Sequence, residues 1–197
     1  MALRLLPGVT VSCSPSKTMV SMASDGSPAD ADSFGATVSA SGRYVAFLSL
    51  ASNFVPGIPG PNVLRVYLRD MCTGAPPGCT PATTSISVAG DGATADDPSI
   101  SADGRYIAFA SGAADLVPGD TNGAQDIFVR DTCAGVSSGC TPSTVRVSVA
   151  LDGTQGNGGS GRPVISADGR FVVFISAAKL GPGGRNFLGA EVYLARQ

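Results

Sequence analysis

A nine-residue string occurs three times in this chain, with only small changes between the copies. The copies are residues 39–47 (SASGRYVAF), 101–109 (SADGRYIAF) and 166–174 (SADGRFVVF). They begin 62 and 65 residues apart. A repeat of this length predicts a fold in which one supersecondary unit is stacked on copies of itself.

Each copy has the pattern of a β-hairpin. A Ser-Gly or Asp-Gly pair lies between two short runs of β-forming residues, and such pairs favour tight turns because Gly tolerates a positive φ. After the turn the side chains alternate between the two faces of a strand, so Ala108 and Phe109 are predicted on opposite faces. We predict a core of stacked strand faces, filled by Val45, Phe47, Ile107, Phe109, Val172 and Phe174.

Two more strands complete the repeating unit. A third is predicted over 65–70 (RVYLRD), 126–131 (DIFVRD) and 191–196 (EVYLAR), and a fourth over 84–88 and 145–149. Four antiparallel strands connected as a meander, here called A to D in chain order, form the blade of a β-propeller. The predicted fold class is therefore all-β, a propeller of four-stranded antiparallel blades. The repeated Arg43, Arg105 and Arg170 are expected to bond across blades or to cap the turn between strands A and B.

An additional D strand is predicted near the start of the chain, over 17–22. The sequence around it, with Cys13 before and Asp25-Gly26 after, repeats the sequence around the other D strands. The strand order is then D, ABCD, ABCD, ABC, which gives three blades. We predict a single domain of residues 1–197, with repeats at about 23–89, 90–150 and 151–197 and strand 17–22 completing a split blade.

Three blades leave a ring open, because propeller rings have about 4–8 blades. We expect two copies to form a homodimer with six blades, in which the D strand of each chain completes the last blade of the other. Such pairing would also cover strand edges that otherwise invite aggregation. The alternative is that these 197 residues are a fragment of a longer propeller.

The repeated motifs resemble those of TolB-like β-propellers, a WD-like repeat family. The resemblance is carried by SADGRYIAF at 101–109, followed by DIFVRD at 126–131. Ala40, Ala102 and Ala167 stand where that family usually has Pro. The resemblance implies a bacterial protein of the periplasm or the extracellular space that binds a protein or peptide. We therefore expect a non-catalytic binding or scaffold module, in a family whose members serve many roles.

Four of the five cysteines form two pairs at the same place in the repeat, between strands C and D. Disulfides Cys72–Cys79 and Cys133–Cys140 would each close a short loop and would indicate an oxidising compartment. Zinc is the alternative, but the spacing is not Cys-x₂-Cys and the chain has no histidine. Cys13 lacks a partner in this pattern, so we expect a free thiol or an intermolecular bridge, and the missing partner favours the fragment alternative.

Composition limits the classes of function. The 13 Lys and Arg residues are spread along a chain of net charge −2, which argues against a nucleic-acid partner. No stretch approaches the ~20 apolar residues that span a bilayer. The absence of histidine excludes a Ser-His-Asp site and His-ligated metals. The enzymatic alternative is a propeller hydrolase or lyase that acts on carbohydrates or lactones through Asp or Ca²⁺.

The connection from strand D to strand A differs between the copies. It carries Asp30 and Asp32 in the first, Asp96 and Asp97 in the second, and Arg162 in the third. Variable polar residues on a shared scaffold are typical of binding sites, so we predict a binding rim here. An acidic rim would favour cationic peptides or a divalent ion, and the alternative is ordinary solvated loop polarity.

One further segment has the composition of a cation-binding loop. In residues 120–126 (DTNGAQD), oxygen-bearing side chains alternate around a Gly, so that Asp120, Asn122 and Asp126 could bind Ca²⁺. The segment lacks the later acidic ligand of an EF-hand, and the alternative is a loop built on an Asx-turn. No other cofactor is expected.

Overall fold

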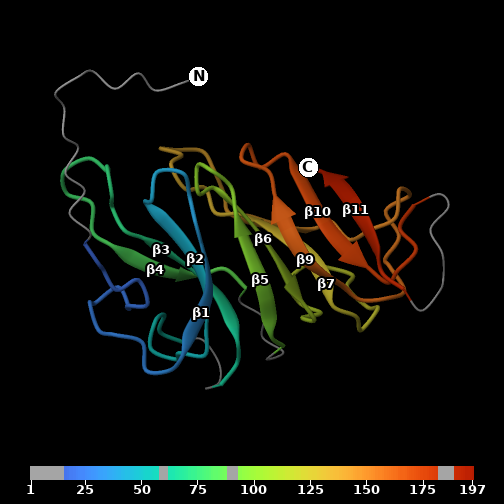
Figure 1. Ribbon diagram of the computed structural model, residues 1–197, viewed down its shortest axis with the longest axis horizontal. Helices are drawn as coiled ribbons and strands as arrows, with labels where there is room; N and C mark the ends of the chain where they lie inside the picture. The colour runs from blue at the N-terminus through green and yellow to red at the C-terminus, as the bar shows by residue number, and fades with distance from the viewer. Residues whose placement is uncertain (1–15, 58–61, 88–92, 182–188) are drawn as a thin grey trace, which may run out of the picture.

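The computed structural model describes residues 16–57, 62–87, 93–181 and 189–197. Within these ranges the chain contains eleven β-strands in three antiparallel sheets, which follow one another along the molecule (Figure 1). No helix that could cross a membrane is found among the described residues. The strands are β1 (Ser33–Val38), β2 (Tyr44–Ser49), β3 (Arg65–Asp70), β4 (Ala82–Ser85), β5 (Ala95–Ile100), β6 (Tyr106–Ser111), β7 (Asp126–Asp131), β8 (Ser143–Arg146), β9 (Ser160–Ile165), β10 (Phe171–Ser176) and β11 (Glu191–Arg196).

The three sheets are meanders of the kind expected for propeller blades. The first has the order β1-β2-β3-β4, the second β5-β6-β7-β8 and the third β9-β10-β11. All pairings within them are antiparallel. The predicted all-β class is confirmed, but the D strands β4 and β8 begin two residues earlier than predicted. Residue 88, the last residue of one predicted D strand, lies outside the described ranges.

The first predicted D strand is not formed within one chain. Over 17–22 the only ladder contact with other described residues is an isolated bridge between Met22 and Pro28. The same bridge recurs between Val149 and Gln155, just after β8. The segment is therefore followed by the same bridged turn that follows the D strand β8. Residues 16–19 themselves are exposed and have no strand partner among the described residues.

The core consists of apolar side chains held between neighbouring blades. One cluster joins Ala46, Leu48 and Val66 of the first blade to Ile107 and Phe109 of the second. A second cluster joins the opposite face of the second blade, including Ala108 and Val129, to Val172 and Phe174 of the third. All six predicted core residues are buried, and Ala108 and Phe109 lie on opposite faces of β6, as their alternation predicts.

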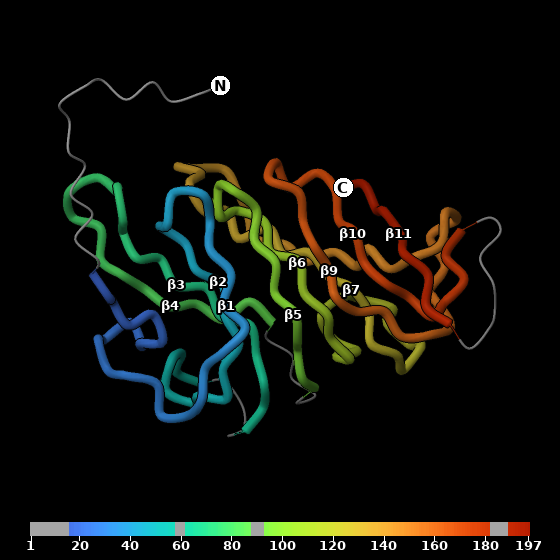
Figure 2. The backbone as a smooth tube through the Cα atoms, in the orientation of Figure 1, coloured from blue at the N-terminus to red at the C-terminus, as the bar shows by residue number. Residues whose placement is uncertain are grey.

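The A strands β1, β5 and β9 form the inner edge of this stack. Strand β5 contacts both β1 and β9, whereas the outermost strands β4, β8 and β11 make their main contacts within their own blades. The blades therefore converge at the A strands and spread apart toward the outside, and Figure 2 shows them arranged in sequence from the blue to the red end of the chain.

Neighbouring blades also meet at the turns between strands A and B. Tyr44 packs on Gly104 of the next blade, where an added Cβ would lie 2.2 Å from its ring, and Tyr106 packs on Gly169 in the same way. The amide of Ala102 donates to the carbonyl of Ala167 in the next blade at 2.9 Å, repeating a bond made one blade earlier. Each interface therefore runs in one direction, from the aromatic side of one blade to the turn of the next.

Candidate functional site

The inner strands carry an irregularity at the same place in every blade. The register of each A–B pair shifts there, which marks a β-bulge. The residue in the bulge has a positive φ in all three copies: 61° at Gly35, 51° at Asp97 and 54° at Arg162. A left-handed conformation costs a residue with a side chain about 1–2 kcal/mol. Strain of this kind in non-glycine residues is a reason to suspect function.

The bulges bring two of the predicted rim residues together. The backbone amide of Arg162 donates to a carboxylate oxygen of Asp97 at 3.3 Å, although the two residues are 65 apart in the chain and belong to different blades. Both side chains are exposed. Two cavities, of about 290 and 380 Å³, share Asp97 and Arg162 in their linings. The inner edge therefore presents an exposed acidic and an exposed basic residue on neighbouring bulges, with hollows next to them.

Asp96 lies beside this pair and is half-buried. Burial raises the pKa of its carboxyl, and the neighbouring charge of Asp97 raises it further. The two adjacent acids therefore differ in character, because Asp97 is exposed and bonded to an amide while Asp96 is partly withdrawn from solvent.

The remaining predicted rim residues, Asp30 and Asp32, lie at a different place in the repeat, so the predicted residues do not all belong to the connection from strand D to strand A. Asp30 and Asp32 precede strand β1, whereas Asp96, Asp97 and Arg162 lie inside β5 and β9. Asp30 accepts hydrogen bonds from the amide and the hydroxyl of Ser52, at 2.8 and 2.6 Å. The Ser52 side chain is the main cause of the lowered pKa of Asp30. Asp30 thus joins two loops. Asp97 and Arg162 were assigned to loops because the bulged strands that carry them contain Pro98 and Pro163, which gives these strands the sequence pattern of a loop.

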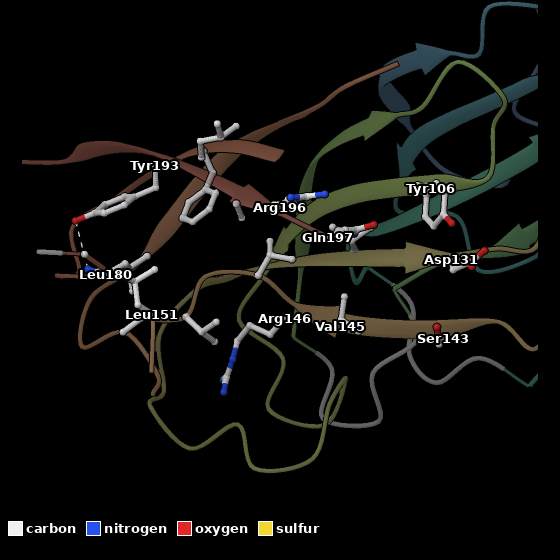
Figure 3. A pocket seen from close by; sticks show the side chains of 18 residues that line it. Tyr106, Asp131, Ser143, Val145, Arg146, Leu151, Leu180, Tyr193, Arg196 and Gln197 are labelled. Atoms are coloured by element: carbon white, nitrogen blue, oxygen red, sulfur yellow. Dashed lines mark hydrogen bonds between the residues drawn. The ribbon is translucent and has the colours of Figure 1, made fainter. Parts of the chain in front are cut away.

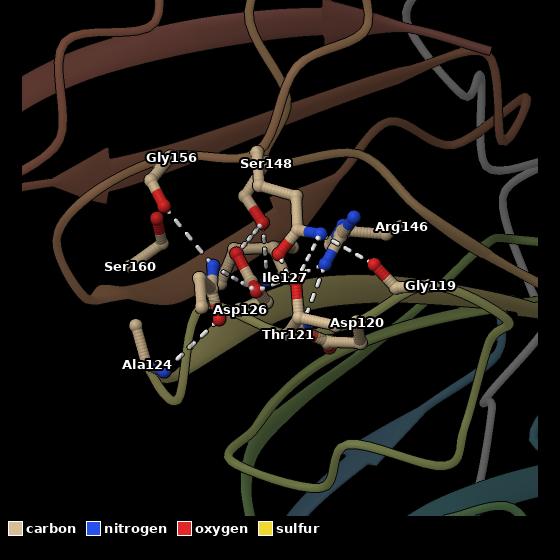
Figure 4. A network of polar contacts seen from close by, with 12 residues as sticks. Gly119, Asp120, Thr121, Ala124, Asp126, Ile127, Arg146, Ser148, Gly156 and Ser160 are labelled. Atoms are coloured by element: carbon tan, nitrogen blue, oxygen red, sulfur yellow. Dashed lines mark hydrogen bonds and ion pairs between the residues drawn. The ribbon is translucent and has the colours of Figure 1, made fainter.

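The predicted calcium ligands do lie together, and two of them, Asp120 and Asp126, contact an arginine (Figure 4). Arg146 on β8 places its Nη1 atom 2.9 Å from Asp120 and 3.5 Å from Asp126. Asn122 donates to Asp126 at 2.8 Å, and the hydroxyl of Ser148 donates to the other oxygen of Asp126 at 2.5 Å. The carboxylates therefore already have a cationic partner.

Burial makes this polar cluster structurally important. Asp126 is fully buried and Asp120 nearly so. Burial raises the pKa of Asp120, which the nearby guanidinium of Arg146 partly opposes. Calcium binding here stays a prediction, and it would require Arg146 to leave the cluster. Sequence reasoning missed Arg146 and Ser148, although Ser87 and Ser148 recur at the same place in the repeat and signalled a shared role.

Both predicted disulfides are present, and each belongs to a larger repeated unit. Cys72–Cys79 and Cys133–Cys140 each join Cα atoms 5.8 Å apart. Asp131, which ends β7, accepts from the amide of Cys133 at 2.9 Å and from Arg105 at 2.6 Å. Each disulfide lies beside an Asp carboxylate, and one Asp with two Cys could in principle bind a metal ion. In both such groups among the described residues the two sulfurs are bonded to each other, which leaves no thiolate ligands. Cys13 lies outside the described residues.

Two of the three repeated arginines pair within their own blade, whereas we expected bonds across blades or capping of the turn between strands A and B. Arg43 contacts Asp70 at 2.8 Å and Arg105 contacts Asp131 at 2.6 Å, in each case joining the start of strand B to the end of strand C. In the third blade Arg196 occupies the position of the carboxylate, opposite Phe171. The third blade therefore lacks this ion pair.

Comparison with known proteins gives matches in structure only. No protein-family model matches the chain, and no curated protein matches it significantly. The chain is similar to two TolB structures. For a protein from Agrobacterium tumefaciens assigned as TolB, the identity is 19 % and the TM-score 0.45, over 81 % of this chain and 40 % of that one. For TolB from Acinetobacter baumannii, the values are 17 % and 0.30, over 87 % and 42 %.

A third match is a structure from work on two prolyl endopeptidases. Its identity to this chain is 15 % and its TM-score 0.43, over 84 % of this chain and 20 % of that one. The chain thus spans less than half the length of each of these three structures.

Proposed function

We propose that this chain is a non-catalytic module that binds a protein or peptide in an oxidising compartment, the periplasm or the extracellular space. Its working form is a six-bladed ring of two copies. The observation that carries the proposal is that the end blades expose apolar side chains at positions that the inner interfaces bury, Val192 and Leu194 on the third blade and Val38 on the first. The two disulfides support the choice of compartment.

The open face of the third blade is equivalent to the face by which each of the first two blades packs on the next blade. Val192 and Leu194 of β11 are 71 % and 65 % exposed. The register of the sheets makes them equivalent to Ile127 and Val129 of β7, which are buried against the third blade. Exposed apolar side chains grouped on one sheet face are typical of an interaction surface.

The open face of the first blade has the complementary features. Val38 is 59 % exposed, whereas the equivalent Ile165 is buried in the interface between the second and third blades. The turn glycine Gly42 has no atom near its missing Cβ, whereas Gly104 and Gly169 are each covered by an aromatic ring. Phe171 of a second copy is the equivalent ring for Gly42. Two such contacts, related by a two-fold axis, would close six blades into a ring.

The ring would place two copies of the Asp97–Arg162 pair at its inner edge. Residues of opposite charge on neighbouring bulges suit a peptide that carries both charges, because each charge of the peptide then has a partner of opposite sign. Residues on irregular backbone held by a rigid scaffold are common in binding sites. We therefore expect peptides of mixed charge to bind better than uniformly basic ones.

Light scattering tests the ring. We expect twice the chain mass of 19.6 kDa, and a monomer for Leu194→Asp, because a carboxylate would be buried in the contact. Val136→Asp is the matched control, since Val136 is also an exposed apolar residue but lies in a disulfide loop. A wild-type monomer at micromolar concentration would overturn the ring.

Fluorescence anisotropy with labelled hexapeptides of alternating Lys and Asp tests the binding site. We expect saturable binding that falls at least about tenfold in the double variant Asp97→Asn/Arg162→Gln. Asp32→Asn is the control, because Asp32 precedes β1 and lies outside the bulges. Equal binding by the double variant would place the ligand elsewhere, and an absence of binding by all mixed-charge, basic and acidic hexapeptides would reject a peptide site on this module.

A further inference from the structure

The outer edge of the third blade has no strand partner in the part of the chain that the structure describes. Strands β3 and β7 each pair with a D strand, but no described strand pairs with the outer side of the equivalent β11. A strand edge of this kind offers a row of amide and carbonyl groups to another strand. Addition of a strand to such an edge is an established mode of peptide recognition, in which the backbone supplies affinity and side-chain pockets supply specificity.

An apolar groove runs along this edge (Figure 3). The groove has a volume of about 840 Å³ and lies between β8 of the second blade and β11 of the third. Its apolar lining includes Val145, Val147, Leu151, Phe174, Leu180 and Tyr193. A strand added to β11 would direct every second side chain into this groove, since side chains alternate between the faces of a sheet.

The sequence supplies a segment that matches the two D strands. Residues 16–21 (SKTMVS) occupy the same place in the repeat as 82–87 (ATTSIS) and 143–148 (STVRVS), because the Met22–Pro28 and Val149–Gln155 bridges fix the alignment. The final serine has a role in both formed blades. The hydroxyls of Ser87 and Ser148 accept hydrogen bonds from the backbone amides of Val66 and Ile127, at 2.9 and 3.0 Å.

The segment is also already placed against the correct blade face. Ile86 lies in the interface between the first and second blades, and Val147 lies in the interface between the second and third. The equivalent Val20 packs on the open face of the first blade, against the cluster that contains Phe47 and Tyr67. Residues 16–21 therefore leave the first blade where a D strand of a preceding blade would lie.

We propose that residues 16–21 of a second copy pair with β11 and complete the third blade as its fourth strand. This inference rests on the proposed ring and names the segment that locks it. By the register of β7 with β8, Met19 lies opposite Tyr193 and Lys17 opposite Ala195. Met19, which is 58 % exposed in the single chain, enters the apolar groove. The hydroxyl of Ser21 accepts a hydrogen bond from the backbone amide of Val192.

Engineered disulfides test this register. In a Cys13→Ser background, Lys17→Cys and Ala195→Cys would lie directly opposite on neighbouring strands, where Cβ atoms are about 4.5–5.5 Å apart and a disulfide needs little adjustment. We expect a covalent dimer on non-reducing electrophoresis after mild oxidation. The control pair Lys17→Cys with Leu194→Cys places the two thiols on opposite faces of the sheet, so it should not cross-link.

The outcomes separate this proposal from the ring itself. A dimer mass by light scattering without the specific cross-link would overturn strand exchange and leave the ring standing. A monomer would overturn both, whereas a ladder of cross-linked oligomers would support strand exchange and reject closure by two copies. Met19→Asp gives a second measurement, since we expect it to weaken dimerisation at least about tenfold while leaving the melting temperature of the monomer unchanged.

Discussion

Replacing Gly104 by Ala tests whether the aromatic-on-turn contact holds neighbouring blades together. The new methyl would lie 2.2 Å from a ring carbon of Tyr44, and the residue would have to keep a φ of +82°. The left-handed backbone costs about 1–2 kcal/mol, and overpacking adds about 1–3 kcal/mol. Gly42→Ala has the same turn position and a φ of +71°, but no atom lies within 4 Å of its Cβ, so it carries the backbone cost alone.

We therefore expect Gly104→Ala to lose about 1–3 kcal/mol more of unfolding free energy than Gly42→Ala. Urea unfolding followed by far-ultraviolet circular dichroism measures both losses. The Leu194→Asp background keeps the proposed contact between copies from contributing. Adding Tyr44→Ala should remove the excess cost, since contacting residues do not act additively. Equal losses for the two variants, or an excess that survives Tyr44→Ala, would refute the packing argument.

Three more predictions follow from the polar and disulfide units. Hydrogen bonding from Arg105 lowers the pKa of Asp131, so this pair stabilises the fold above about pH 4 and the contribution is lost as the pH falls. Arg105→Gln should therefore flatten that part of the curve of stability against pH. Arg170→Gln is the control and should leave the curve unchanged, because its blade lacks the carboxylate. Cys133→Ser/Cys140→Ser should cost about 2–3 kcal/mol of unfolding free energy, and wild-type protein in reductant should show the same direction of change in its melting temperature. Arg146→Met leaves two buried carboxylates without their cation, so we expect a loss of about 3–5 kcal/mol and partial rescue of the melting temperature by millimolar Ca²⁺; no rescue would end the calcium hypothesis.

Local pattern was enough to predict the B and C strands and the core, and it placed the D strands less accurately. Alternation at 106–110 placed Ala108 and Phe109 on opposite faces of a strand, and each face is buried against a different neighbour. The paired cysteines were equally readable, because a short loop fixes which partner is near. In both cases the determining contacts are close in sequence or repeat with the blade.

Contacts between blades were harder to predict. Asp97 and Arg162 resembled loop residues because a bulge with a following proline has the composition of a loop, and only the register of the sheets puts them in equivalent positions. Asp120 and Asp126 pair with the side chain of Arg146 on the neighbouring strand, which the sequence did not reveal, and Ca²⁺ binding by these residues stays a prediction. Oxygen ligands could be recognised from sequence, whereas the identity of their partner depended on strand pairing.

The directional contact between blades also limits how copies can be joined. Each blade offers an aromatic ring on one side and a turn glycine on the other, so two copies cannot meet through identical ends. The two ends of a copy are different and complementary, so copies always join in the same direction around the ring axis. A tandem fusion that links Gln197 of one copy to residue 16 of the next should therefore give a single polypeptide that needs no partner. Its blade count would be set by the number of copies encoded.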